Sequence, residues 1–295
     1  MKKKVELFDI INICILSIMA LMSVYPILNI LMVSLSTRSY VSAGVVKLIP
    51  KGFNFNAYIY AFSDPQIFMS LAVTFAKVII GVLISLIISI LTAYPLSLES
   101  EEFPLRTFFA YYYIITMLFG GGLIATFLTI KYIGLYDTFW VLVIPTAAGA
   151  GQAILLLNFF RGLPKELKES AFVDGAGHWD ILFRVVVPLS KAVIATVTVF
   201  LIIGHWNDWF AAIIYTNNPN LQPLQTYLRS KLNSVVLQLD NSRGLTIDQL
   251  MALSKIDDTI VRASLIIISA LPILFVYPFM QKYFVKGVVL GSVKG

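Results

Sequence analysis

The chain has 295 residues, of which 58% are hydrophobic and 13% are charged, and its mean hydropathy is +0.84. This composition excludes a soluble globular domain and indicates an integral membrane protein. The formal net charge is +6, but no basic block is interleaved with aromatic residues, so we assign the lysines to membrane topology and expect no nucleic acid partner.

Six stretches meet or approach the length of about 20 apolar residues that a helix needs to cross a membrane. The first follows three lysines and is too long for a signal-peptide core, so we predict that it is retained. Charges interrupt only the second stretch, at Lys77, and the fifth, at Lys191 and Asp208. The predicted spans are Ile10 to Leu35, Ile67 to Leu98, Thr107 to Ile130, Thr138 to Phe160, Val187 to Tyr215 and Ala263 to Met280.

These stretches predict an all-α membrane protein with six transmembrane helices and with both termini on one side. That side carries twelve lysines and arginines against nine on the other. Five of the nine lie in one long loop, where charges contribute little to orientation, so we predict that both termini are cytoplasmic. We divide the chain into residues 1–66, the first span with an external loop; residues 67–285, the transmembrane core; and residues 286–295, a basic cytoplasmic tail.

The loops between these spans differ in character. The external segment Ser36 to Gln66 contains prolines, a glycine and scattered aromatics, and we expect it to pack on the membrane surface. The second external segment, Thr216 to Val261, opens on a cluster of turn-forming residues before a more helical run. On the cytoplasmic side, Glu99 to Arg106 is predicted to form a short acidic turn.

The most polar passage of the chain is residues 161–190. Pro164 suits the first turn of a helix, and Gly175 can take the left-handed conformation that ends one. We predict a short amphipathic helix, a glycine break and a second helix. Lysines and glutamates keep the first helix soluble, and its apolar face is expected to comprise Leu163, Leu167, Ala171 and Phe172.

Within this passage, Glu169-Ser170-Ala171 is followed by three residues, Gly175, nine residues, Val185, one residue, and Val187-Pro188. This resembles the loop of the inner-membrane components of binding-protein-dependent ABC importers, whose pattern is Glu-Ala-Ala, three, Gly, nine, Ile, one, Leu-Pro. Serine replaces one alanine, and valines replace the isoleucine and the leucine. An ordinary interfacial helix between two spans is the alternative interpretation. The chain also resembles the maltose-permease-like carbohydrate branch of this family, which handles oligosaccharides. The similar segments are residues 120–124, 134–140, 204–209 and 281–287.

The resemblance implies a type I importer permease fold, in which cytoplasmic coupling helices dock on ATPase subunits. It also implies a second permease that completes a heterodimeric pore, two ATPase subunits and an external sugar-binding protein. The resemblance implies that the tail from Gln281 to Gly295 lies near the ATPases. The alternative is that this tail is a frayed terminus attracted to anionic lipid. The implied ATPase-coupling residues are Glu169, Ser170, Ala171, Asp174, Gly175 and Pro188.

The coupling residues suggest distinct roles. We expect Glu169 to make a charged contact with the ATPase, and Gly175 to set the bend that transmits ATPase closure to the fifth span. The chain has no glycine-rich loop that ends in Gly-Lys-Ser or Gly-Lys-Thr, so we expect ATP to bind only to partner subunits, and we predict no enzyme activity and no cofactor. Gly120 to Gly122 are interpreted as a flexible or closely packed part of a helix.

Charges inside a membrane are costly, so Lys77 and Asp208 require an explanation. We place Lys77, Asn207 and Asp208 on a candidate substrate path, where Lys77 faces the pore or pairs with a neighbouring subunit; a snorkelling lysine is the alternative. His205 is expected to be packed and hydrogen-bonded rather than to carry protons, and Trp209 to belong to an interfacial belt. The one cysteine and two histidines predict no disulfide and no metal site.

The sequence therefore predicts a permease subunit of a bacterial inner-membrane importer that moves carbohydrate, expected to be oligosaccharide, by ATP-driven alternating access. An ion-coupled secondary transporter is the alternative, but it would usually have more intramembrane carboxylates and two related halves. A membrane-embedded enzyme would need a convergent set of His, Asp and Glu residues, which we do not find. The sequence does not identify the sugar.

Overall fold

The computed structural model describes residues 7–240 and 258–292, and these residues contain helices, turns and loops but no strand. The all-α prediction is therefore confirmed for this part of the chain. The chain forms two compact units, one from residues 1–67 and 228–272 and the other from residues 68–227 and 273–295. The predicted divisions after residues 66 and 285 stay predictions.

The first two predicted spans are single long helices. α1 (Leu7–Ser34) and α4 (Gln66–Ser97) are each long and apolar enough to cross a membrane. α4 buries one face, on which residues recur every three or four positions, as expected of a helix packed against other helices. That face consists mostly of small residues that permit close helix packing, namely Ser70, Thr74, Gly81, Ser85, Ser89 and Ala93.

Three of the predicted spans are bent pairs of helices in the structure. In the third, α5 (Arg106–Leu118) and α6 (Gly122–Tyr132) meet at 114°. In the fourth, the short helices η1 (Phe139–Leu142) and η2 (Ile144–Thr146) precede α7 (Ala150–Arg161), with a bend of 44°. Counted by length and composition, the described residues hold two long spans, or up to five if each bent pair is one span.

The remaining bent pair lies in the fifth span, and the sixth span is longer than predicted. α11 (Lys191–Asn207) is bent by 81° from the helical segment of residues 178–189, so the predicted start at Val187 is wrong. α12 (Phe210–Tyr215) follows α11 after a second break. The sixth predicted stretch lies within α15 (Asp258–Ser292), of which Thr259–Phe275 is counted as a shorter apolar helix.

The breaks have local causes in the sequence. Gly122 has a φ angle of +75°, in the left-handed region where glycine avoids the strain of a side chain, so the three glycines at 120–122 form a sharp turn and not a packed helix segment. Pro145 lies within η2, where it lacks the N–H that a continuous helix needs. Residues 181–186 form a π-helix, η3, which ends two residues before Pro188, whose ring crowds the carbonyl of the preceding turn.

The predicted loops contain short helices. α2 (Arg38–Ser42) and α3 (Asn56–Phe62) lie in the predicted first external segment. The hydroxyl oxygen of Tyr58 in α3 lies 2.7 Å from that of Ser34 at the end of α1. The predicted membrane-surface packing of this segment is not tested. The turn-rich start of the second segment becomes η4 (Pro219–Leu221), and the predicted helical run is confirmed as part of α13 (Leu224–Asp240).

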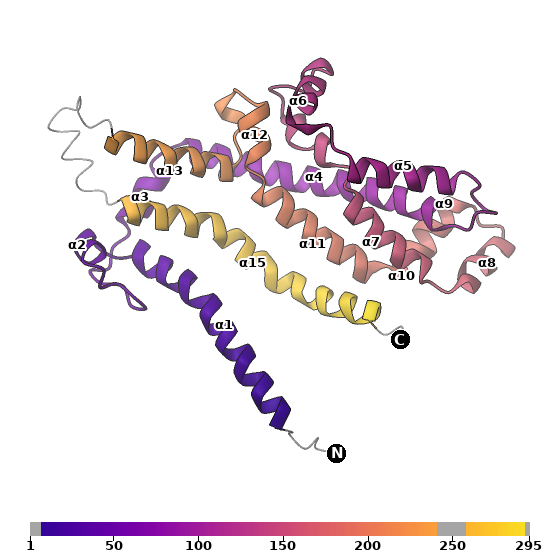
Figure 1. Cartoon of the computed structure of the whole chain (residues 1–295), viewed down its shortest axis with the longest axis horizontal. Helices are drawn as coiled ribbons and strands as arrows, with labels where there is room; N and C mark the ends of the chain where they lie inside the picture. Colours follow the sequence, from indigo (N-terminus) through magenta and orange to yellow (C-terminus); the bar gives the residue numbers. More distant parts are fainter. Residues whose placement is uncertain (1–6, 241–257, 293–295) are drawn as a thin grey trace. The chain divides into compact units, whose positions relative to one another are not determined.

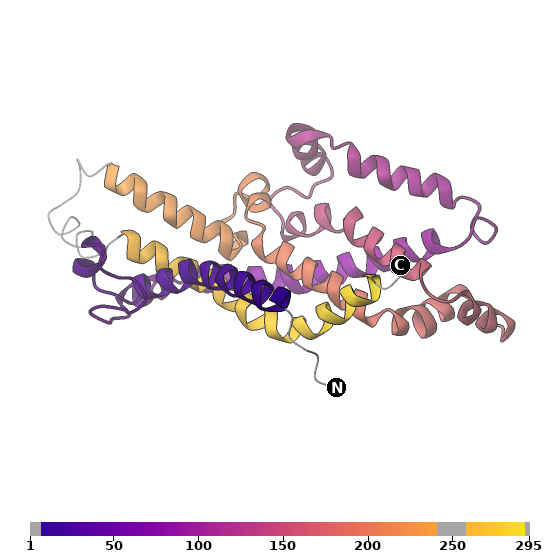
Figure 2. The same cartoon turned by 60° about the horizontal axis from the view of Figure 1, so that its bottom comes forward.

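The second unit has a hydrophobic core that joins α4, α7 and α11. Leu156 and Phe160 from α7, Ile181 from η3 and Val197 from α11 are all completely buried there. A smaller cluster unites Val73, Ile130, Leu142, Ala212 and Tyr215. Within this unit, α8 (Lys165–Val173) lies at one end, and α6 and α12 lie towards the other (Figures 1 and 2). The unit therefore presents the polar passage and the α11–α12 break at different ends.

Candidate functional site

The predicted amphipathic helix of the polar passage is α8, and it ends as the sequence predicts. Gly175 has a φ angle of +81°, which is the left-handed conformation. The N–H of Gly175 donates to the carbonyl of Phe172 at 3.0 Å, and that of Ala176 donates to Ala171 at 3.0 Å. This pair of hydrogen bonds is the Schellman arrangement, which satisfies the last carbonyls of a helix and turns the chain sharply.

The apolar face predicted for α8 is divided between the protein core and solvent. Leu163, Ala171 and Phe172 pack against the core cluster of the second unit, so most of that face is already occupied within this chain. Leu167 remains 41% exposed, and Val173, which lies outside the predicted apolar face, is 88% exposed. The surface that α8 offers to a partner is therefore narrower than predicted. The exposed coupling candidates are Glu169, Ser170, Asp174, Gly175 and Pro188.

The second helix of the passage is composite and anchors α8 to α4. It comprises α9 (His178–Asp180), η3 (Ile181–Val186) and α10 (Val187–Leu189). The Tyr94 hydroxyl of α4 lies 3.1 Å from Nδ1 of His178, and the ring of Phe172 packs edge-on against the same imidazole. One histidine therefore contacts both α4 and α8.

A second set of contacts ties α8 to the turn that follows α4. The guanidinium of Arg161 donates to the carbonyl of Leu96 at 3.0 Å, and that of Arg106 donates to the carbonyl of Leu98 at 2.9 Å. Both arginines thus satisfy carbonyls at the C-terminal end of α4. Lys165 of α8 pairs with Glu99 at 2.8 Å. The four charged residues of these contacts line a polar cavity of about 460 Å³, together with Ser97, Glu101, Glu102, Leu163, Lys168 and Glu169.

The ion pair between Glu99 and Lys165 sets the electrostatics of this turn. The hydrogen bond and charge of Lys165 lower the pKa of Glu99, and Glu99 in turn raises the pKa of Lys165. Burial lowers the pKa of Lys168, although the nearby carboxylates of Glu102 and Glu99 partly oppose this. The stabilisation that Glu99 gives the folded turn is fully present above its ordinary pKa and is lost as the pH falls through the lowered pKa. The stabilisation that Lys165 gives is lost only as the pH rises through its raised pKa. Both groups are therefore charged at neutral pH.

Reversing one charge of this pair is expected to weaken the link between α8 and the end of α4. Glu99→Lys should lower transport and make it more sensitive to salt, because two lysines would then repel each other across the turn. The double variant Glu99→Lys with Lys165→Glu should recover most of the loss. Transport by vesicles between pH 6 and 9 measures this, and no pH dependence is expected from the wild-type pair. Equal loss in the single and double variants would contradict the prediction.

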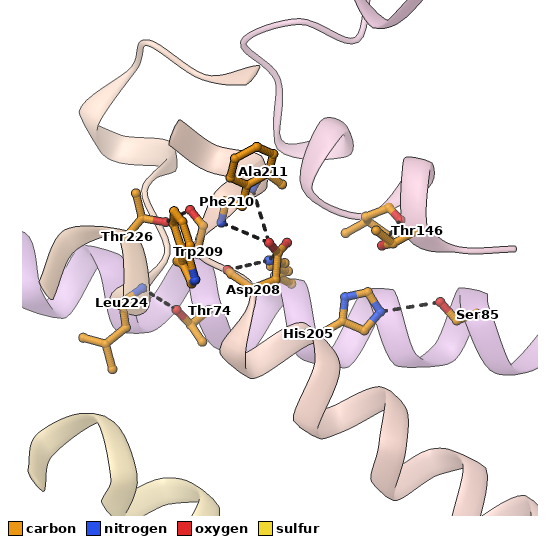
Figure 3. A network of polar contacts seen from close by, with 12 residues as sticks. Thr74, Ser85, Thr146, His205, Asp208, Trp209, Phe210, Ala211, Leu224 and Thr226 are labelled. Carbon is orange, nitrogen blue, oxygen red and sulfur yellow. Dashed lines mark hydrogen bonds and ion pairs between the residues drawn. The ribbon is translucent and has the colours of Figure 1, made fainter. Parts of the chain in front are cut away.

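At the α11–α12 break, Lys77 and Asp208 form a buried ion pair. Lys77 is completely buried, and its Nζ lies 2.7 Å from Oδ2 of Asp208 and 3.1 Å from the Asp208 carbonyl oxygen. The other carboxylate oxygen of Asp208 accepts the N–H groups of Phe210 and Ala211, which begin α12 (Figure 3). One carboxylate therefore neutralises an intramembrane lysine and fixes the helix that follows.

The histidine next to this pair is packed, as the sequence predicts. His205 is 6% exposed, its Nε2 lies 3.5 Å from the Ser85 hydroxyl (Figure 3), and its ring fills the space over Gly81. A Cβ atom at Gly81 would lie 2.6 Å from the imidazole, so only glycine fits this face of α4 without a shift. The sequence shows Gly81 only as a small residue in an apolar run, so its contact with His205 could not be predicted from it.

The ion pair brings together two of the three residues of the predicted substrate path. Lys77 is completely buried and pairs with Asp208 of the same chain, so it does not snorkel and its charge is neutralised without a neighbouring subunit. That Lys77 lies on the substrate path stays a prediction. The side chain of Asp208 is 26% exposed, and Asn207 beside it is exposed. Contact of Asn207 or Asp208 with substrate stays a prediction. No group of three or more potential metal ligands occurs among the described residues.

Comparison with known proteins identifies the family. Residues 100–290 match the family described as the binding-protein-dependent transport system inner membrane component. The chain belongs to this family. A polygalacturonan/rhamnogalacturonan transport system permease protein of Bacillus subtilis (strain 168) is 37% identical over 292 residues, 99% of this chain and 100% of that protein. Protein LplC of the same organism is 36% identical over 290 residues, 98% of this chain and 96% of that protein.

A solved structure supports the same assignment. A chain of a bacterial ABC transporter involved in the import of the acidic polysaccharide alginate is similar, with a TM-score of 0.83 and 31% identity, over 96% of this chain and 99% of that one. A second structure, of an alginate ABC transporter in complex with a periplasmic protein that carries an alginate pentasaccharide, has a TM-score of 0.54 at 17% identity and supports the fold alone.

Family membership decides between the alternatives left open by the sequence. The protein is a multi-pass membrane permease of the ABC importer type. The matched region of this permease contains α8, the composite helix after it and Asp208, whereas Lys77 lies before it. Of the residues that the resemblance selected, all but Pro188 lie on α8 and its bend, and Pro188 lies in α10.

Proposed function

We propose that this permease forms half of the pore of an ATP-driven importer that moves oligosaccharides into the bacterial cytoplasm. The observation that carries the proposal is α8, a short, charged and exposed helix that ends in a glycine bend, in a chain of this family. Glu169 and Val173 offer a charge and an apolar contact to a partner. A partner must supply the energy, since the chain has no phosphate-binding loop.

The proposed assembly contains a second permease, two ATPase subunits and a sugar-binding protein. We place α8 and both termini in the cytoplasm and the membrane protein in the bacterial inner membrane, with lipid around its apolar helices. ATPase closure would move α8, and the contacts of α8 with α4 and η3 would rock the spans between inward-open and outward-open states. Glu169, Ser170, Ala171, Asp174, Gly175 and Pro188 are the proposed coupling residues.

The substrate class proposed here is an acidic oligosaccharide built from uronic acids. Two relatives similar along nearly the whole chain support it, because one is named for polygalacturonan and rhamnogalacturonan and the other for alginate. Polygalacturonan, rhamnogalacturonan and alginate all contain sugar carboxylates. The binding protein would make most of the selection, and Asn207 and Asp208 are the candidate contacts in this chain.

Glu169→Lys is expected to release the ATPase from this permease. The tagged chain, purified from native membranes in mild detergent, should bring down a second permease and an ATPase subunit, which mass spectrometry and an ATPase assay would detect. The variant should keep the second permease and lose the ATPase. Lys131→Glu, an exposed charge reversal on α6, is the matched control and should keep both. Recovery of the wild-type chain alone, without ATPase activity, would contradict the proposed function.

The substrate class needs a separate test. Vesicles that contain the complete importer should hydrolyse ATP faster when the binding protein is supplied with a galacturonate trisaccharide than when it is supplied with maltotriose. Uptake of the labelled galacturonate trisaccharide should likewise exceed uptake of labelled maltotriose. If only maltotriose stimulates ATP hydrolysis, the proposed importer function stands and the proposed acidic substrate class is wrong.

A further inference from the structure

The turn that precedes η1 holds its chain in an unusual conformation at Asp137. Its φ angle is +58°, the only positive φ among the described residues other than glycine. This left-handed region is uncommon for residues with a side chain, although aspartate and asparagine tolerate it best. The conformation therefore requires compensating contacts.

The contacts of Asp137 all go to the segment that leaves α12. Its backbone N–H donates to the carbonyl of Tyr215 at 2.9 Å. Its Oδ1 accepts the backbone N–H of Asn217 at 2.8 Å and that of Asn218 at 2.9 Å. The left-handed turn thus brings one carboxylate and one N–H onto three positions, Tyr215, Asn217 and Asn218, at the end of α12 and in the loop after it, about 80 residues away in the sequence.

The same loop is fixed at its other end. The N–H of Leu224 donates to the buried hydroxyl of Thr74 at 2.7 Å, and the Thr226 hydroxyl donates to the carbonyl of Trp209 at 2.9 Å (Figure 3). Residues 217–220 between these anchors are exposed. The backbone of the loop is therefore held from both sides, while its three asparagines, Asn217, Asn218 and Asn220, remain exposed.

We propose that Asp137 is a positioning residue that presents the loop of residues 217–220 to the sugar-binding protein. The inference rests on the proposed function. Figure 1 shows this loop beyond α12, towards the end of the unit that lies away from α8, which is the side a binding protein would approach if α8 meets the ATPases. Exposed asparagines on a backbone held at both ends form a polar, preorganised surface, which lowers the entropy lost on docking.

The test uses the complete importer in nanodiscs and its own binding protein, loaded with a galacturonate trisaccharide. We measure the binding-protein concentration that gives half-maximal ATPase activity. Asp137→Ala should raise this concentration about tenfold, because two hydrogen bonds to a charged acceptor are lost. The maximal rate should change less than twofold. Asp137→Asn keeps an acceptor and tolerates the same φ angle, so it should stay within about twofold of wild type.

A second pair of variants removes a donor instead of the acceptor. Asn218 has a φ angle of −71°, which proline accepts, so Asn218→Pro deletes one N–H that Asp137 binds. Asn218→Ala is the control, since both variants lose the side chain that accepts the N–H of Asn220. The binding-protein concentration that gives half-maximal ATPase activity should be about fivefold higher for Asn218→Pro than for Asn218→Ala.

The outcomes separate this inference from the function on which it rests. An unchanged half-maximal concentration in Asp137→Ala overturns the inference alone, and so does a loss confined to the maximal rate. If Asp137→Ala does not assemble, the two Asn218 variants decide, and equal values for them overturn it. A wild-type importer that no loaded binding protein stimulates overturns the proposed function as well.

Discussion

Asp208→Ala is expected to destabilise this permease by about 3–5 kcal/mol, the usual cost of leaving a buried charge without its partner. Lys77 has no exposed surface on which to find water, and Asp208 is its ion-pair partner. The same substitution also removes the oxygen that accepts two N–H groups of α12. The midpoint of thermal unfolding of the purified permease measures the loss.

The two ends of this ion pair should respond unequally. Lys77→Met is expected to cost less than Asp208→Ala, because Asp208 stays partly exposed and its carboxylate retains the backbone donors of α12. Asp208→Asn should fall between them, since the amide can still accept those N–H groups. The double variant Lys77→Met with Asp208→Asn should recover part of the loss, because no buried charge remains.

An exposed ion pair supplies the control for these variants. Asp180 and Arg184 are separated by one helical turn, and their side chains are 47% and 82% exposed. Asp180→Asn should change stability by less than about 1 kcal/mol. If it costs as much as Asp208→Asn, burial is not the cause of the effect. Equal losses for Lys77→Met and Asp208→Ala would also contradict the argument.

The sequence was a good guide where a local rule decides the structure. The left-handed Gly175 after α8 follows from helix-ending preferences, and α1 and α4 follow from long apolar runs, of which only the second contains a charge, at Lys77. Hydropathy alone could not locate the break at Gly122 or the two around α11, because a bent span buries the same apolar residues as a straight one. The three consecutive glycines are interpreted from the sequence as a flexible or closely packed helix segment, whereas in the structure they lie in the turn between α5 and α6.

Long-range contacts account for the rest. Lys77 and Asp208 were both selected because charges are rare in a membrane, but 131 positions separate them and no local rule joins them. Arg106 and Arg161 were counted only as topology signals, whereas both bind carbonyls at the end of α4. Asp137 lay in a segment selected by resemblance, yet its φ angle and its contacts with residues 215–218 depend on the folded chain.

Gly175→Leu is expected to abolish transport while leaving the permease folded. At a φ angle of +81°, a branched side chain strains the backbone by about 1–2 kcal/mol, which the α8 bend can relieve by changing direction. A Cβ atom there would have nothing within 4 Å in this chain, so a clash inside the subunit is not the cause. Uptake into vesicles, with ATPase content measured on the same sample, checks the prediction.

Gly175→Asn distinguishes the two ways in which this position can act. Asparagine tolerates the left-handed conformation but adds a side chain. If the bend is what matters, Gly175→Asn should transport nearly as well as wild type, whereas Gly175→Leu should not. If instead an ATPase surface approaches this glycine closely, both variants should lose the ATPase. Transport that survives Gly175→Leu would reject the bend as a transmitting element, and the contacts of α8 with α4 through Lys165 and His178 would then have to carry the motion.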